Sequence, residues 1–169
     1  RESVKEYSFM NNKEKYNRVL GGEYNLASGD GKWFGKAFVH KSFRPSEINN
    51  KQNISSGIMI TRNTNKSLIM FYSAYVGDDF RSDLGYYRRY GMYKFEPNYR
   101  FRIYPDNPKI QEIELSHYAA WVFRTELENK YEGNIHYSQI QLKYLSTSRL
   151  SLQRRQSKTY LYYDFDPTR

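Results

Sequence analysis

The stretch IMITRNTNKSLIMFYSAYV, residues 58–76, is the part of the sequence that decides the fold. Its two flanks, 58–62 and 67–76, are rich in β-branched and aromatic residues, which favour strands over helices. The short segment between them, centred on 63–65, is polar and turn-forming. Two such runs joined by a few turn residues are typical of a β-hairpin. The sequence therefore predicts a hairpin at the centre of the chain.

Strand-like patterns continue on both sides of this hairpin. Upstream, the aromatic and aliphatic residues of 33–43 alternate with lysine, histidine and arginine, as in a half-buried strand, and 49–57 is expected to be a loop. Downstream, further strands are predicted at 86–95, 99–104, 135–145, 149–155 and 158–165, with 96–98 joining the first two. Residues 110–130 are compatible with either a helix or a strand. Many short strands at near-regular spacing favour a sandwich or a barrel.

The N-terminal region has a different pattern. In residues 1–20, the spacing of Tyr16, Val19 and Leu20 suits a short amphipathic helix, which Gly21 and Gly22 would end. The 169 residues are expected to form one domain, because this length matches a single hydrophobic core. The predicted organisation is an N-terminal helix at 1–20 followed by β structure at 24–169.

Composition narrows the function classes. The chain has 27 Lys and Arg against 18 Asp and Glu, a formal net charge of +9, which favours anionic partners. It has no cysteine, which excludes disulfides, thiolate nucleophiles and cysteine-based zinc sites. Since no apolar stretch approaches the ~20 residues of a spanning helix, we expect no transmembrane segment. Eighteen tyrosines and ten phenylalanines argue against disorder.

Familiar catalytic and metal-binding patterns are missing from the sequence. The three histidines, His40, His117 and His136, are widely spaced and form no ligand motif, so no metal site is expected. No GxSxG nucleophile turn is present.

The strongest chemical signal is arginine interleaved with aromatic residues between 86 and 104. Arg88, Arg89, Arg100 and Arg102 fall within fifteen residues. Because side chains alternate along a strand, Arg100 and Arg102 should share one face and Tyr99 and Phe101 the other. Arginine binds carboxylates and phosphates, and flat aromatic walls suit a planar ligand or stacked bases.

Several segments, in order, resemble the bilin chromophore lyases of the CpcT/CpeT type, which attach open-chain tetrapyrroles to phycobiliproteins. The matching pieces are quoted from this sequence. They are GEYN at 22–25, FVHKSFRP at 38–45, FYSAY at 71–75, YRRYGMYKF at 87–95, YEG at 131–133, YLSTS at 144–148 and DFD at 164–166. Two more pieces, GKWF at 31–34 and PNYRFR at 97–102, are similar to segments of a related lyase type.

This resemblance implies a closed, antiparallel, lipocalin-like β-barrel whose interior binds one bilin as substrate or ligand, with no separate cofactor. The arginines would bind the propionates and aromatic residues would form the walls. The implied ligand-binding residues are Arg88, Arg89, Arg100, Arg102, Tyr72, Tyr87, Tyr93 and Trp33. An acid that protonates the bilin would come from Glu23, Asp78 or Asp79. The nucleophilic cysteine would belong to the acceptor phycobiliprotein. The expected location is the cytoplasm or the plastid stroma.

Two other hypotheses stay open at this point. One is a non-enzymatic basic β-domain that scaffolds or binds an acidic protein, with a filled barrel and an outward-facing basic strip. Ala74-Tyr75, which stands where the lyase family has Glu-Gln, favours it. The other is a module for single-stranded nucleic acid, which would expose an open aromatic face lined by lysine and arginine.

Overall fold

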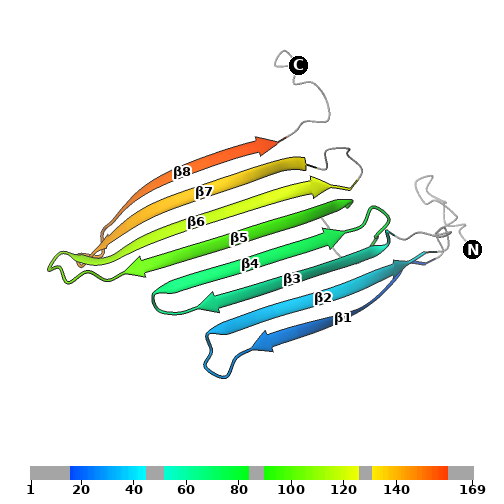
Figure 1. The fold of residues 1–169 in the computed structure, drawn as a ribbon, viewed down its shortest axis with the longest axis horizontal. Helices are drawn as coiled ribbons and strands as arrows, with labels where there is room; N and C mark the ends of the chain where they lie inside the picture. The colour runs from blue at the N-terminus through cyan, green and yellow to red at the C-terminus, as the bar shows by residue number, and fades with distance from the viewer. Residues whose placement is uncertain (1–15, 45–51, 84–89, 126–130, 160–169) are drawn as a thin grey trace, which may run out of the picture.

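The computed structural model describes residues 16–44, 52–83, 90–125 and 131–159, and these form one antiparallel β-sheet (Figure 1). No helix occurs among them. The eight strands are β1 (Arg18–Ala27), β2 (Trp33–Phe43), β3 (Ile54–Asn63), β4 (Ser67–Val76), β5 (Met92–Ile103), β6 (Ile110–Arg124), β7 (Tyr131–Tyr144) and β8 (Arg149–Thr159).

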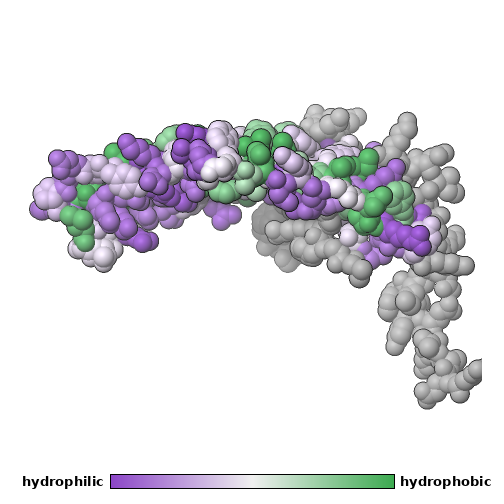
Figure 2. Space-filling model, turned by 90° about the horizontal axis from the view of Figure 1, so that it is seen from below, coloured by the Kyte–Doolittle hydropathy of each residue, from purple (hydrophilic) through white to green (hydrophobic). Residues whose placement is uncertain are grey.

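The strands follow one another across the sheet in the order in which they occur in the chain. Each one pairs with the next in antiparallel register, so the sheet is a simple meander. Seen from the side, the described strands form a single thin, arched layer (Figure 2). The central hairpin predicted from residues 58–76 is confirmed as β3 and β4.

The closed barrel predicted from the resemblance is wrong for the described residues. β1 and β8 lie at opposite edges of the sheet and do not pair with each other. Alternating hydrophobicity specifies which face of a strand is buried, but it carries no information on whether the two edges of a sheet meet. The mainly β, antiparallel part of the prediction is confirmed.

The predicted N-terminal helix is also contradicted where it can be compared. Residues 18–20 belong to β1, which continues through Gly21 and Gly22, because this segment pairs residue by residue with β2. Residues 1–15 lie outside the described part of the chain.

Several strand boundaries differ from the sequence prediction. The two strands expected on either side of 96–98 are one strand, β5, which runs through Pro97. Proline tolerates the extended backbone and lacks only its N–H, and the Glu96–Pro97 step is missing from the β5–β6 ladder. The open alternative at 110–130 is resolved as a strand up to Arg124. β3 already begins at Ile54, inside the predicted loop.

Side-chain alternation gives the sheet two different faces. One face carries most of the exposed aliphatic and aromatic side chains and is called the apolar face below. The other face, called the polar face, carries the carboxylates of Glu23, Glu96, Glu112 and Glu114. The remaining carboxylate of the strands, that of Glu132, lies at a β-bulge in β7.

The small buried core lies mainly against the polar face. Ala74, Val76 and Ala120 of this face are buried there, together with Phe80 from the connection after β4. The backbone N–H of Arg81 donates to the buried Ser42 hydroxyl at 3.2 Å, and Asp79 N donates to the carbonyl of Gln52. The 77–83 segment is therefore folded back onto the ends of β2 and β3.

Candidate functional site

The predicted arginine site is partly present on the polar face. Arg100 and Arg102 share that face, as predicted, and both lie against one carboxylate, Glu114 of β6. The Nε atoms of the two arginines lie 3.3 and 3.4 Å from Glu114 Oε1 and Oε2, respectively. Each guanidinium therefore already has an anionic neighbour. Arg88, Arg89 and Tyr87 lie outside the described residues.

The predicted aromatic walls are divided between the two faces. Tyr72 is on the polar face, where Lys94 lies over its ring. Tyr93 and Trp33 are on the apolar face, where Tyr93 accepts a hydrogen bond from Ser73 Oγ and Arg62 lies over the Trp33 ring. The structure thus does not gather the predicted ligand-binding residues around one cavity.

The three candidate acids are also separated. Glu23 lies on the polar face of β1, with Lys36 Nζ 2.8 Å and His40 Nε2 3.5 Å from its carboxylate oxygens. Asp78 accepts a hydrogen bond from Thr125 Oγ1 at 2.5 Å, and the carbonyl of Asp79 accepts one from Arg44. The first acid is in a strand, whereas the other two lie in the connection after β4.

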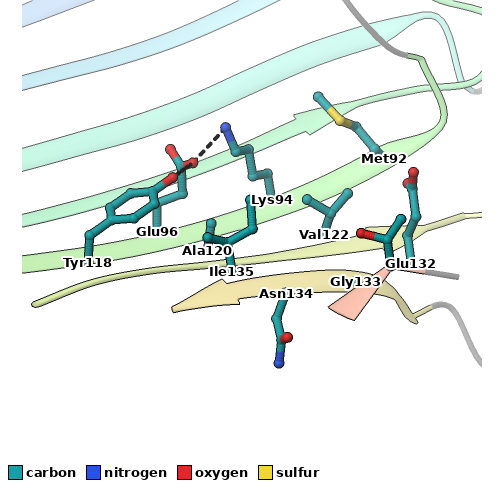
Figure 3. A pocket seen from close by; sticks show the side chains of 11 residues that line it. Met92, Lys94, Glu96, Tyr118, Ala120, Val122, Glu132, Gly133, Asn134 and Ile135 are labelled. Atoms are coloured by element: carbon teal, nitrogen blue, oxygen red, sulfur yellow. Dashed lines mark hydrogen bonds and ion pairs between the residues drawn. The ribbon is translucent and has the colours of Figure 1, made fainter. Parts of the chain in front are cut away.

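A pocket on the polar face, near the ends of β5 to β8, was not predicted. It has a volume of about 410 Å³. Its lining is Met92, Lys94, Glu96, Tyr118, Ala120, Val122, Glu132, Gly133, Asn134, Ile135 and Thr159. Figure 3 shows Lys94, Glu96 and Tyr118 together at one side of it, while Asn134 points away to the other face.

Two donors converge on a single carboxylate oxygen in this pocket. Lys94 Nζ lies 2.6 Å from Glu96 Oε1, and the Tyr118 hydroxyl donates to the same oxygen at 2.6 Å (Figure 3). Glu96 is only 9% exposed, so these charge-assisted contacts offset the cost of burying its charge.

The most unusual property of the molecule is its apolar face. The described residues include 22 exposed large hydrophobic side chains, and 17 of them point to this one side of the sheet. The 17 are Leu20, Tyr24, Leu26, Trp33, Val39, Phe43, Ile58, Ile60, Ile69, Tyr93, Tyr99, Phe101, Ile103, Leu115, Ile140, Leu150 and Leu152. Large contiguous patches of this kind mark interaction or membrane surfaces.

Sequence reasoning missed this face although the signal was present. The alternation was recognised in single strands, but it was interpreted as one face packed against a core. The other signal was the lack of any acidic residue at alternate positions, such as 93–103 in β5, that share the apolar face.

No family model, no curated protein and no solved structure matches this chain. Among the described residues, no helix is long and apolar enough to cross a membrane. Within the same part of the chain, no group of three or more histidine, aspartate or glutamate side chains is arranged to hold a metal ion.

Proposed function

We propose that the chain forms a wall of a membrane-embedded β-sheet, with its apolar face against lipid and its polar face toward water. The observation that carries the proposal is the segregation of exposed hydrophobic side chains, 17 of 22 on one face. Membrane-spanning strands alternate in this way, apolar toward lipid and polar toward the interior. The proposal departs from the expectation of no transmembrane segment, which rested on a criterion for helices.

The distribution of acidic side chains fits this orientation. Three acidic side chains of the polar face each lie beside at least one basic side chain. The pairs are Glu23 with Lys36, Glu96 with Lys94, and Glu114 with Arg100 and Arg102. On the apolar face no strand carries a carboxylate. The same face carries five basic side chains, all but Arg154 within two residues of a strand end: Arg18, Lys41, Arg62, Arg154 and Lys158. Charges facing hydrocarbon are costly, whereas charges facing a water-filled interior are common.

Strand lengths and connections also support the proposal. The strands have 10 to 15 residues, and a tilted strand needs about 9–11 to cross the hydrocarbon. At one end of the sheet the connections are short: 28–32, 64–66, 104–109 and 145–148. At the other end, 44–53 and 77–91 are longer, whereas 125–130 has 6 residues, as many as 104–109. Membrane β-proteins have short turns on one side and longer loops on the other.

The edges of the sheet set a condition on the proposal. In hydrocarbon every backbone N–H and C=O must be hydrogen-bonded, and β1 and β8 each present an edge that pairs with no other described strand. The membrane-embedded form therefore requires both edges to pair with further strands.

Tryptophan fluorescence tests the proposal directly, because Trp33 and Trp121, the only tryptophans, both lie on the apolar face. The chain would be refolded into phosphatidylcholine vesicles with or without bromine on the acyl chains. We expect bromine to quench the emission. In a control variant, both tryptophans become phenylalanine and Asn25 of the polar face becomes tryptophan, and its emission should stay unquenched. Absent quenching, or equal quenching of the two proteins, would refute the proposal.

The bilin-lyase hypothesis remains a prediction from the resemblance. On the polar face, a propionate would have to compete with Glu114 for Arg100 and Arg102. Absorption spectra of phycocyanobilin mixed with the protein and with Arg100→Ala test it. A red-shifted band that weakens in the variant would support it, whereas a spectrum identical to free bilin would reject it.

A further inference from the structure

The edge strand β8 is basic along its length. Its 11 residues include four basic side chains and no acidic one: Arg149, Arg154, Arg155 and Lys158. Every residue of the strand is exposed. β8 lies at the end of the sheet, and β7 is the only described strand with which it pairs (Figure 1). Its outer edge therefore presents backbone hydrogen-bonding groups and positive charge together.

The neighbouring strand does not neutralise these charges. Across the β7–β8 ladder, the partners of the four basic residues are uncharged or basic: Asn134, Tyr137, Ser138 and Lys143. None of the three arginines of β8 forms an ion pair with another described residue. By contrast, Arg100 and Arg102 of β5 both lie against Glu114. Positive charge is thus compensated inside the sheet but not at this edge.

The basic side chains of β8 point to both faces of the sheet. Arg154 and Lys158 lie on the apolar face, whereas Arg149 and Arg155 lie on the polar face. A flat anionic surface, such as a layer of lipid headgroups, would contact one pair and leave the other on the far side. A strand added in the plane of the sheet reaches both pairs, because its own side chains alternate between the two faces. Its backbone would also pair with the outer edge of β8.

The charge of the edge selects which strand it admits. Opposite charges directly across two strands stabilise their pairing, whereas like charges destabilise it. Charged residues on an edge strand also hinder pairing with unsuitable strands. The four basic side chains of β8 therefore disfavour a basic strand and favour one with carboxylates at the facing positions.

From the outer edge, the uncompensated arginines and their distribution over both faces, we propose that β8 binds an acidic protein segment as an added β-strand. The carboxylates of that segment face the four basic side chains of β8. This inference goes beyond the proposed membrane function and does not rest on it, because a sheet edge binds an extended segment in water as well. In a membrane, the same carboxylates would pair with Arg154 and Lys158, which share the apolar face.

Peptide binding tests the proposal. A fluorescein-labelled peptide of the length of β8 would consist of threonine, with glutamate opposite each basic residue in antiparallel register. It would be mixed with the full chain in non-ionic detergent micelles, and fluorescence anisotropy would give Kd. One control peptide has lysine in place of glutamate. The other is the acidic peptide with a methylated backbone, which keeps the charge but cannot form ladder hydrogen bonds. We expect the acidic peptide to bind about tenfold more tightly than either control.

Charge reversal at the edge should reverse the preference. The double variant Arg154→Glu with Arg155→Glu should bind the lysine peptide more tightly than the acidic one, a gain that unfolding cannot produce. Arg18→Glu on the opposite edge strand, which is also exposed, should keep the preference of the wild type.

Two results would overturn the proposal. Equal binding of the methylated and unmethylated acidic peptides would mean that β8 attracts anions of any kind, lipid headgroups included, without adding a strand. An unchanged preference in the double variant would mean that the peptide binds elsewhere. Bromine quenching of the tryptophans involves neither peptide, so the membrane function stands or falls separately.

Discussion

The Tyr118 hydroxyl donates a 2.6 Å hydrogen bond to Glu96 across the β5–β6 ladder. This contact joins two adjacent strands on the polar face and ends on a nearly buried carboxylate, which Lys94 also contacts. The three side chains lie together at the pocket on the polar face, near the ends of β5 and β6. Their pairing makes a charge tolerable at this position without exposing it.

Replacing Tyr118 by phenylalanine should destabilise the sheet by about 1.5–3 kcal/mol, the usual range for a lost hydrogen bond to a charged group. Unfolding by urea in detergent micelles would measure it. Tyr137→Phe is the matched control, because the Tyr137 hydroxyl on the same face donates to the neutral Gln139 Oε1 at 3.2 Å. That variant should lose about 0.5–1.5 kcal/mol. Equal losses would mean that the charge on Glu96 does not strengthen its bond to Tyr118.

Position 57 should accept only glycine without loss of stability, because the Phe38 ring lies too close to admit a Cβ atom. A Cβ built there would lie 2.6 Å from Cε1 and 2.7 Å from Cζ of the Phe38 ring, and 3.1 Å from the Ser73 carbonyl oxygen. Gly57→Ala would force the ring to move and should cost about 1–3 kcal/mol, as overpacking does. At Gly22 a Cβ would meet nothing within 4 Å, so Gly22→Ala should be neutral or slightly stabilising. Urea unfolding of the two variants checks this, and a Gly57→Ala midpoint at or above that of wild type would contradict it.

Much of the sheet could be predicted, because several of its strands are specified by the pattern of residues within the strand itself. The alternation in 33–43 and the hairpin at 58–76 specify β2, β3 and β4 without reference to the rest of the chain. The placement of Arg100 and Arg102 on one face followed from the same period of two. The helix expected before Gly21 failed because three apolar positions are too few to establish a period, and pairing of residues 18–20 with β2 determined their conformation.

Closure and the candidate site were not predictable in this way. Whether β1 meets β8 depends on twist and stagger summed over all eight strands, which no local pattern encodes. The contact of Glu96 with Tyr118 joins residues 22 positions apart and depends on the β5–β6 register. The role of the apolar face could not be predicted, because alternation shows which side chains share a face and not whether that face contacts water, lipid or protein.

The turn between β1 and β2 should respond to acid through Asp30. Its Oδ1 accepts hydrogen bonds from the Ser28 hydroxyl at 2.6 Å and from the backbone N–H of Lys32 at 3.1 Å. These bonds, with the Ser28 bond the larger cause, hold the pKa of the Asp30 carboxyl well below its usual value. Because the folded pKa is lowered, the stabilisation of the turn is fully present above the unfolded pKa and is lost as pH falls through the folded pKa.

The Lys32 amide chemical shift, followed by NMR against pH, would report this titration. Its midpoint should lie below about 3.9, the ordinary aspartate value. Asp30→Asn should remove the transition. A midpoint at the ordinary value would show that the two hydrogen bonds do not form in solution.

A positive charge on the apolar face should impair membrane insertion far more than the same charge on the polar face. Ile60 and Thr61 are neighbours on β3 that point to opposite faces. Ile60→Arg would place a guanidinium against hydrocarbon, at a cost of about 2–4 kcal/mol near the bilayer midplane, whereas Thr61→Arg would meet the water-facing side. The fraction of each variant that floats with phosphatidylcholine vesicles in a density gradient measures the difference. In a sheet surrounded by water, Ile60 would be an ordinary exposed residue, and the two variants would behave alike.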